Sequence, residues 1–260
     1  MPFTFAHAAA ALPLRRTRLV PSALVVGCFA PDFQYFLRLA PGGGYGHTLA
    51  GMFILDLPLA LLVLWLFHRY AKESLWEWMP RRIRERVRLG PRALEVKTAR
   101  RFALVAISIL VGEATHIIWD SFTHRSFWPY RHLRFLHWRM VLPLGSLPCY
   151  QLLQYASSII GSLVILIWFL RMPRNADASL PEPTGNSRVS ARKVLVFACA
   201  AALAAGLVRA CLGVGVPDSV ARAEEFAVQA LIAVISVFWL ELVAYGIMRD
   251  RIARRQMQTA

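Results

Sequence analysis

The sequence predicts an all-α protein: a polytopic membrane helical bundle with about five spanning helices and an N-terminal surface or re-entrant helix. Of its 260 residues, 57% are hydrophobic and only 17% are charged, and the mean hydropathy is +0.46. A soluble domain is about half apolar and about a quarter charged. The apolar residues also gather in runs of about 20 residues, the length that crosses a bilayer. Both observations indicate an integral membrane protein.

The expected spans divide the chain into three parts. Residues 1–170 form a membrane domain, 171–193 a Pro/Asn/Ser-rich cytoplasmic linker, and 194–260 a two-helix membrane hairpin with a basic tail. The five runs that are long enough to span are Thr48–Phe67, Phe102–Trp119, Leu152–Leu170, Val194–Gly213 and Phe226–Ile247.

The N-terminal region is apolar but differs from the five spans. Met1–Leu14 has no positive charge before it and is followed by arginines, the reverse of a secretory signal peptide. Leu19–Leu39 is interrupted by Pro31-Asp32, and an aspartate in the middle of a span is costly. We therefore expect a helix that ends near Ala30 and lies on, or re-enters, the membrane surface without crossing it.

Lysine and arginine are unevenly distributed between the two sides that five spans create. Arg69–Arg101, Arg171–Lys193 and the C-terminal tail hold 20 of them, and the segments on the opposite side hold nine. The positive-inside rule places the richer side in the cytoplasm. We expect a multi-pass protein of the cytoplasmic membrane, with its N-terminus outside and its C-terminus inside. Because orientation accounts for the net charge of +15, we expect membrane lipid rather than nucleic acid as its partner.

A stripe of ionisable residues closes the second span. Glu113, His116, Asp120 and His124 fall within about 80° of one another on a helical wheel of about 100° per residue. A histidine and an aspartate four residues apart can hold one metal ion on one helix. The alternative is a polar helix end where a span meets water, which is the ordinary explanation for any one of these residues taken alone.

Three further candidate ligands are expected on the same outer face. His7, Asp32 and His47 each stand near a predicted helix end, and the topology brings them toward His116 and Asp120. Imidazole and carboxylate ligands without thiolates suit zinc, with manganese or iron as alternatives. Five ligands exceed the needs of one catalytic zinc, so the sequence predicts one or two ions. Asp56 is expected to lie apart, because it falls about 180° from His47 on the wheel.

The order of these residues resembles membrane-bound metal-dependent hydrolase families. It is most similar to the uncharacterised DUF4184 group, whose pattern contains the Pro-Phe-Thr-x-x-His, Pro-Asp-Phe and His-x-x-Trp-Asp-Ser-Phe-Thr-His pieces present here at residues 2–7, 31–33 and 116–124. The resemblance covers roughly residues 1–170. More distantly, the order is similar to the helical zinc phospholipase C and P1-nuclease group, which cleaves phosphodiesters. No second His-x3-Glu piece follows His124, so a third metal site is not expected.

These observations lead to a specific expectation about function. The chain is expected to be a metal-dependent hydrolase that acts on a phosphoester or phospholipid headgroup at the outer membrane face, with Glu113 or His124 moving the proton. The alternatives are a metal-stabilised scaffold and a metal or proton transporter, which would bring polar groups from several spans to the midplane. The candidate substrate ligands are Arg125, Arg131, Gln151 and Gln154.

Overall fold

The computed structural model describes residues 3–42, 44–87, 94, 96–142, 145–173 and 185–259. The described chain is helical apart from one short hairpin, β1 (Arg139–Leu142) paired antiparallel with β2 (Gly145–Pro148). Five helical stretches are long and apolar enough to cross a membrane, which confirms the predicted polytopic helical protein. They are Leu49–Trp78, Ala99–His132, Cys149–Leu170, Lys193–Val214 and Val220–Gln256.

The contacts divide the chain into two units. The first contains residues 1–33, 44–64 and 95–172, and the second contains residues 34–43, 65–94 and 173–260. The domain boundaries predicted at 170 and 193 remain a prediction. Residues 174–184 of the expected linker lie outside the described residues, and α11 (Gly185–Val214) already begins within that linker.

The N-terminal region of the first unit consists of short helices: η1 (Thr4–Ala10), α1 (Ala11–Leu14), α2 (Pro21–Gly27) and η2 (Ala30–Asp32), with α3 (Phe33–Arg38) following. None of them is a candidate span among the described residues, as predicted for Leu19–Leu39. The α2 helix lies against the middle of α8 (Ala99–Thr123), where the backbone N–H of Val20 donates to Ser108 Oγ at 2.9 Å. A contact near the middle of a span favours a re-entrant segment over a surface helix.

Two glycines set how closely α2 and α8 approach. A Cβ on Gly112 would lie 2.3 Å from the carbonyl oxygen of Leu24, and one on Gly27 would lie 2.1 Å from that of Ile109. Such contacts are too short for any side chain, so each helix offers bare backbone where the other crosses it. Small residues serve this purpose in many membrane helix pairs. The close approach brings the end of α2 beside residues 112–116 of α8.

The first span is an interrupted helix. It runs through α4 (Leu49–Gly51), a π-turn η4 (Met52–Asp56), α5 (Leu57–Leu66), a second π-turn η5 (Phe67–Ala71) and α6 (Lys72–Trp78), after a 3₁₀ turn η3 (Tyr45–His47). Thr48 caps its start by accepting a hydrogen bond from the Gly51 N–H at 3.0 Å. A π-turn inserts an extra residue and rotates the side chains that follow it. A regular helical wheel therefore does not apply across Met52–Asp56.

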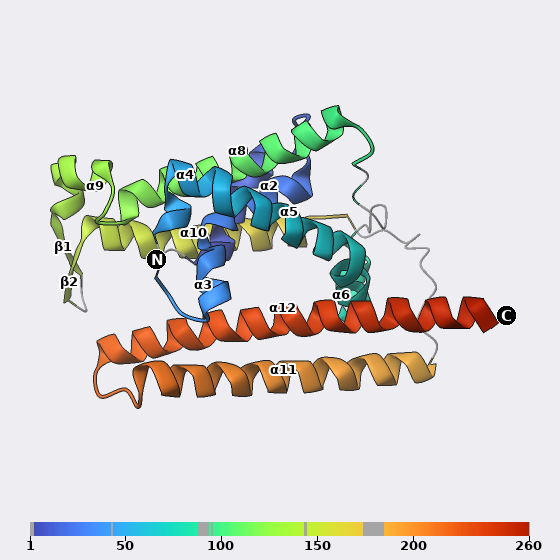
Figure 1. The fold of residues 1–260 in the computed structure, drawn as a ribbon. Helices are drawn as coiled ribbons and strands as arrows, with labels where there is room; N and C mark the ends of the chain where they lie inside the picture. The colour runs from blue at the N-terminus through green and yellow to red at the C-terminus, as the bar shows by residue number, and fades with distance from the viewer. Residues whose placement is uncertain are drawn as a thin grey trace. The chain divides into compact units, whose positions relative to one another are not determined.

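The remainder of the first unit follows α8. The α9 helix (Trp128–His132), the turn η6 (Arg134–His137) and the β-hairpin lead into α10 (Cys149–Leu170), which packs against η1. In the second unit, α11 and α12 (Val220–Thr259) run antiparallel side by side (Figure 1). Ion pairs of 2.7 Å join Arg69 to Asp250 and Glu77 to Arg249, and so tie the C-terminal part of α12 to η5 and α6. The short α7 (Arg81–Arg84) follows α6.

Candidate metal site

The five side chains predicted as metal ligands lie together in the first unit. His7 comes from η1, Asp32 from η2, His47 from η3, and His116 and Asp120 from α8. Their side chains are at most 9% exposed. Four separate segments of the chain therefore meet in one buried polar cluster. That these residues hold a metal stays a prediction.

Asp120 lies at the centre of this cluster. Its Oδ1 is 3.5 Å from His7 Nε2, and its Oδ2 is 3.5 Å from His47 Nε2 and 3.3 Å from His116 Nε2. These separations exceed the usual hydrogen-bond range of about 2.7–3.2 Å. They match the spacing of about 3.3–3.6 Å between ligand atoms that surround one tetrahedral zinc at about 2.0–2.2 Å. The arrangement suits a cation between the side chains better than direct hydrogen bonds between them.

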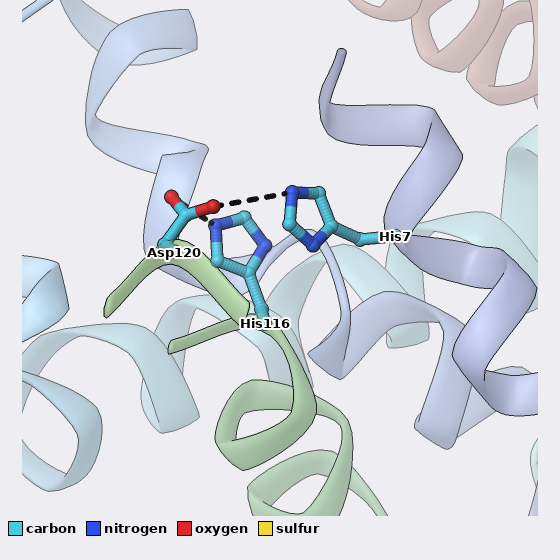
Figure 2. Close-up of side chains that lie close together, drawn as sticks. All are labelled: His7, His116 and Asp120. Carbon is cyan, nitrogen blue, oxygen red and sulfur yellow. Dashed lines mark ion pairs between the residues drawn. The ribbon is translucent and has the colours of Figure 1, made fainter. Parts of the chain in front are cut away.

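Two groups of donors within the cluster are compact enough to hold an ion. His7, His116 and Asp120 form one group (Figure 2), and Asp32, His47 and His116 form the other, each with ligand atoms within 4.8 Å of one another. Both groups use His116. Because one imidazole nitrogen binds one cation, two ions could not both use Nε2 of His116.

Four of the five candidate ligands have donor atoms that are buried without hydrogen-bond partners among the described residues. Within the described part of the chain this holds for His7 Nε2, Asp32 Oδ1, His116 Nε2 and both carboxylate oxygens of Asp120. Buried polar atoms in folded proteins are nearly always paired, and leaving a charged one unpaired is very costly. A cation held between them would satisfy all of these atoms together.

A backbone carbonyl fixes the orientation of His116. The Nδ1 of His116 lies 2.7 Å from the carbonyl oxygen of Cys28, which can only accept, so Nδ1 carries the proton and donates. In the neutral imidazole the lone pair is then on Nε2, the atom that faces Asp32 and Asp120. Metal-ligating histidines are usually held in this way by their second nitrogen.

His7 is held as a neutral imidazole. Its ring stacks on that of His116 at a centroid distance of 3.8 Å. Burial, and then the neighbouring His116, lowers the pKa of His7 to about 3. A neutral imidazole offers a lone pair to a cation without first losing a proton.

The remaining two donors are oriented by η2 and η3. Thr4 Oγ1 donates to Asp32 Oδ2 at 2.5 Å and leaves Oδ1 facing His47 Nε2 at 3.6 Å. Burial raises the pKa of Asp32, which is the expected effect for a carboxyl group removed from water. A Cβ on Gly46 would lie 2.7 Å from the carbonyl oxygen of Pro31, so glycine allows η3 to lie against η2. That contact brings His47 beside Asp32.

The two residues expected to move protons lie in different surroundings. The side chain of His124 is 26% exposed at the end of α8, with Nδ1 3.4 Å from Asp120 Oδ2. Glu113 is completely buried about one turn before His116 on α8, and neither carboxylate oxygen has a hydrogen-bond partner among the described residues. His124 can exchange protons with water, whereas Glu113 cannot do so directly. Both roles stay predictions.

Asp56 was expected to lie apart from the cluster, and this expectation is wrong. It is completely buried, and its carboxylate oxygens would lie 2.9 and 3.0 Å from a Cβ on Gly46, next to His47. It interacts electrostatically with His47, His116 and Asp32, and with Glu113. The helical wheel failed because His47 precedes the helix and the π-turn η4 rotates Asp56 inward. The sequence feature that could have assigned Asp56 to the site is the presence of an aspartate within an apolar span.

The four candidate substrate ligands lie in the sequence between the C-terminal end of α8 and the first turns of α10. The guanidinium of Arg125 donates to Tyr150 Oη from Nε at 2.8 Å and from Nη2 at 2.5 Å, and Tyr150 is buried. Arg131 is exposed on α9, Gln151 is half-buried and Gln154 is buried on α10. Arg125 is therefore the one arginine among them that a buried partner holds in place. Their roles in binding substrate stay predictions.

Comparison with known proteins identifies a family. The model of a family described as a domain of unknown function, DUF4184, matches residues 1–247. The match extends beyond the expected limit near residue 170 and includes both C-terminal spans. No curated protein and no solved structure matches the chain.

Proposed function

The chain belongs to the DUF4184 family, and we propose that it is a membrane-embedded metal-dependent hydrolase. The observation that supports this proposal most strongly is the buried cluster of three histidines and two aspartates, in which His7, Asp32, His116 and Asp120 have buried atoms without hydrogen-bond partners in the described structure. We propose phosphoesters, including phospholipid headgroups, as the substrate class. The resemblance to zinc phosphodiesterases and the arginine held at Arg125 support this choice.

Zinc is the cation that this donor set fits best. Imidazole nitrogens and carboxylate oxygens suit zinc, and manganese or iron would accept the same ligands. Asp56 and Glu113 add two buried carboxyl groups next to the cluster. They are further candidate ligands for a second ion.

The residues of the site have distinct roles in the proposed reaction. When bound, a divalent cation supplies a Lewis acid and makes a water molecule more acidic. His124, which is partly exposed beside Asp120, would take the proton from the attacking water and pass it to solvent. Arg125, held by Tyr150, would bind the non-reacting phosphate oxygens. Burial of His7, Asp32 and His116 would keep bulk water away from the reacting centre.

We further propose that the reaction takes place at the outer face of the cytoplasmic membrane. The cluster lies at the start of the first span and at the end of the second, and the predicted orientation places these ends outside. Substrate would then reach the site from the lipid headgroup layer.

A metal or proton transporter is the second candidate function. Asp56 and Glu113 extend the polar cluster into two spans, as ion pathways do. The remaining buried donors gather at one end of these spans, which favours the enzyme. Uptake of zinc or acidification in sealed vesicles, without any hydrolysis, would favour the transporter.

The direct test is the metal content of purified protein, measured by mass spectrometry for the wild type, His116→Ala and His132→Ala. His132 is a matched control because it lies on α9 with Nδ1 2.9 Å from the carbonyl oxygen of Trp128. We expect zinc, and cleavage of a phosphodiester, in the wild type and in His132→Ala but not in His116→Ala. Full metal content in His116→Ala would overturn the proposed site.

A further inference from the structure

A cavity adjoins the cluster on the side of His7. Its volume is about 340 Å³, and it lies among η1, α8 and α10 of the first unit. It is lined by Ala6, His7, Ala9, Ala10, Thr115, Trp119, Leu153, Ala156, Ser157, Ile160 and Gly161.

Apart from His7 the lining is mostly apolar, because the hydroxyl groups of Thr115 and Ser157 donate to carbonyl oxygens of their own helices. The polar end is His7, whose Nε2 lies 3.5 Å from Asp120 Oδ1. Small side chains such as Ala9, Ala10 and Ala156 leave the space between the helices unfilled. A cavity with this polarity fits an amphiphile whose polar end points toward the cluster.

The cavity is also continuous with the surface that meets the bilayer. Trp119 and Ile160 line it and are 40% and 59% exposed. Both belong to helices that are candidate spans. The material in contact with such a surface is lipid hydrocarbon, because an exposed span faces the membrane interior.

We propose that this cavity holds one acyl chain of a membrane lipid, with the phosphodiester of that lipid placed beside His7. A volume of about 340 Å³ lies at the lower end of the range of about 300–1,000 Å³ for small-molecule sites, so it takes a single chain rather than a whole diacyl lipid. The proposal deepens the proposed function by making the substrate a lipid, and cleavage of the phosphodiester of that lipid rests on that function.

The test uses phosphatidylethanolamine/phosphatidylglycerol vesicles that contain a phosphatidylcholine with a photoactivatable diazirine in its acyl chain. After illumination, mass spectrometry identifies the labelled residues. Ala156→Phe fills the cavity from α10. Ile159→Phe is the matched control, because Ile159 lies on the same helix, is 61% exposed and does not line the cavity.

In the wild type and in Ile159→Phe we expect labelling of Leu153, Ala156 or Ile160. In Ala156→Phe this labelling should fall about tenfold, because the chain loses its buried apolar contacts. Retained zinc content shows that a variant has folded around the cluster, and Ser157→Leu replaces Ala156→Phe if it has not. Equal labelling in the cavity-filled and control variants, or labelling confined to residues outside the cavity, would overturn the proposal.

The labelling requires no turnover, so it can be separated from hydrolysis. If the wild type is labelled in the cavity but cleaves no phosphodiester, the lipid cavity stands and the hydrolase fails. If the wild type cleaves the soluble substrate bis(p-nitrophenyl) phosphate but shows no labelling in the cavity, the hydrolase stands and the lipid cavity fails.

Discussion

His116 Nδ1 lies 2.7 Å from the carbonyl oxygen of Cys28, a residue 88 positions earlier in the chain. The contact exists because α2 ends against α8, where Gly112 leaves room for the backbone of Leu24 and Cys28. A helix crossing thereby determines which nitrogen of His116 carries the proton. The fold and the proposed metal chemistry are coupled at this one hydrogen bond.

This coupling predicts that Gly112→Ala weakens metal binding without changing any ligand. The added Cβ would meet the carbonyl oxygen of Leu24 at 2.3 Å, so α2 must move and carry the Cys28 carbonyl with it. We expect zinc affinity to fall by about 10–100-fold and stability to fall by about 1–3 kcal/mol. Competition with a zinc-binding dye measures the affinity. Gly44→Ala is the control, because nothing lies within 4 Å of its added Cβ, and equal affinities in the two variants would contradict the coupling.

Because Asp120 lies at the centre of the cluster, we expect its replacement to affect metal binding more than replacement of His124 does. Asp120 faces three imidazole nitrogens of the cluster within 3.5 Å, whereas His124 is partly exposed at the rim. We expect Asp120→Asn to abolish metal binding and hydrolysis together. His124→Ala should retain the metal and lose activity, by about 10²–10⁴-fold for a general base. Metal content and rate, measured on the same preparations, separate the two roles; loss of metal in His124→Ala would make it a ligand.

Regular helical geometry explains which parts of the site could be predicted from the sequence. The spacing of His116 and Asp120 was reliable because α8 is an uninterrupted α-helix from Ala99 to Thr123. Asp56 was missed because a π-turn changes the register before it. The Cys28 carbonyl could not be predicted, because a backbone acceptor has no residue type that marks it.

The hairpin β1–β2 was missed for a different reason. Its strands have four residues each, and Met140 and Val141 on β1 are exposed. Strands this short show no clear alternation of apolar and polar residues. The five spans, by contrast, follow from length and composition alone, and these properties do not depend on tertiary contacts.

Replacement of Asp56 should have opposite effects on stability with and without metal. Its two carboxylate oxygens are buried and lack hydrogen-bond partners within the described residues, so in the metal-free protein they oppose folding. We expect Asp56→Asn to raise the thermal unfolding temperature of the metal-free protein and to reduce the increase that zinc produces. Unfolding curves with and without zinc measure both quantities. If zinc raised the unfolding temperature equally in the wild type and the variant, Asp56 would not contribute to zinc binding.

The predicted orientation is tested by fusions to the C-terminus. With 20 lysines and arginines on one side and nine on the other, the positive-inside rule predicts a cytoplasmic C-terminus. A fluorescent protein that folds only in the cytoplasm should be bright after Ala260, and alkaline phosphatase, which requires the periplasm, should be inactive there. The reverse pattern would place the cluster on the cytoplasmic side and exclude a site at the outer face.

Removal of the metal should destabilise the cluster and leave the spans helical. The spans are held in the bilayer by their own apolar surface and internal backbone hydrogen bonds, whereas His7, Asp32 and His47 come from three short segments that converge on α8 at the cluster. A ligand present at about 1,000 times its dissociation constant stabilises the folded state by about 4 kcal/mol. A chelator should therefore lower the unfolding temperature of the wild type and leave its helical circular dichroism unchanged at 25 °C, and added zinc should reverse the shift. His116→Ala provides the internal control, because it has no bound metal to lose and its unfolding temperature should not respond to the chelator. An equal response in the two proteins would mean that the chelator acts elsewhere and that no metal links these four segments.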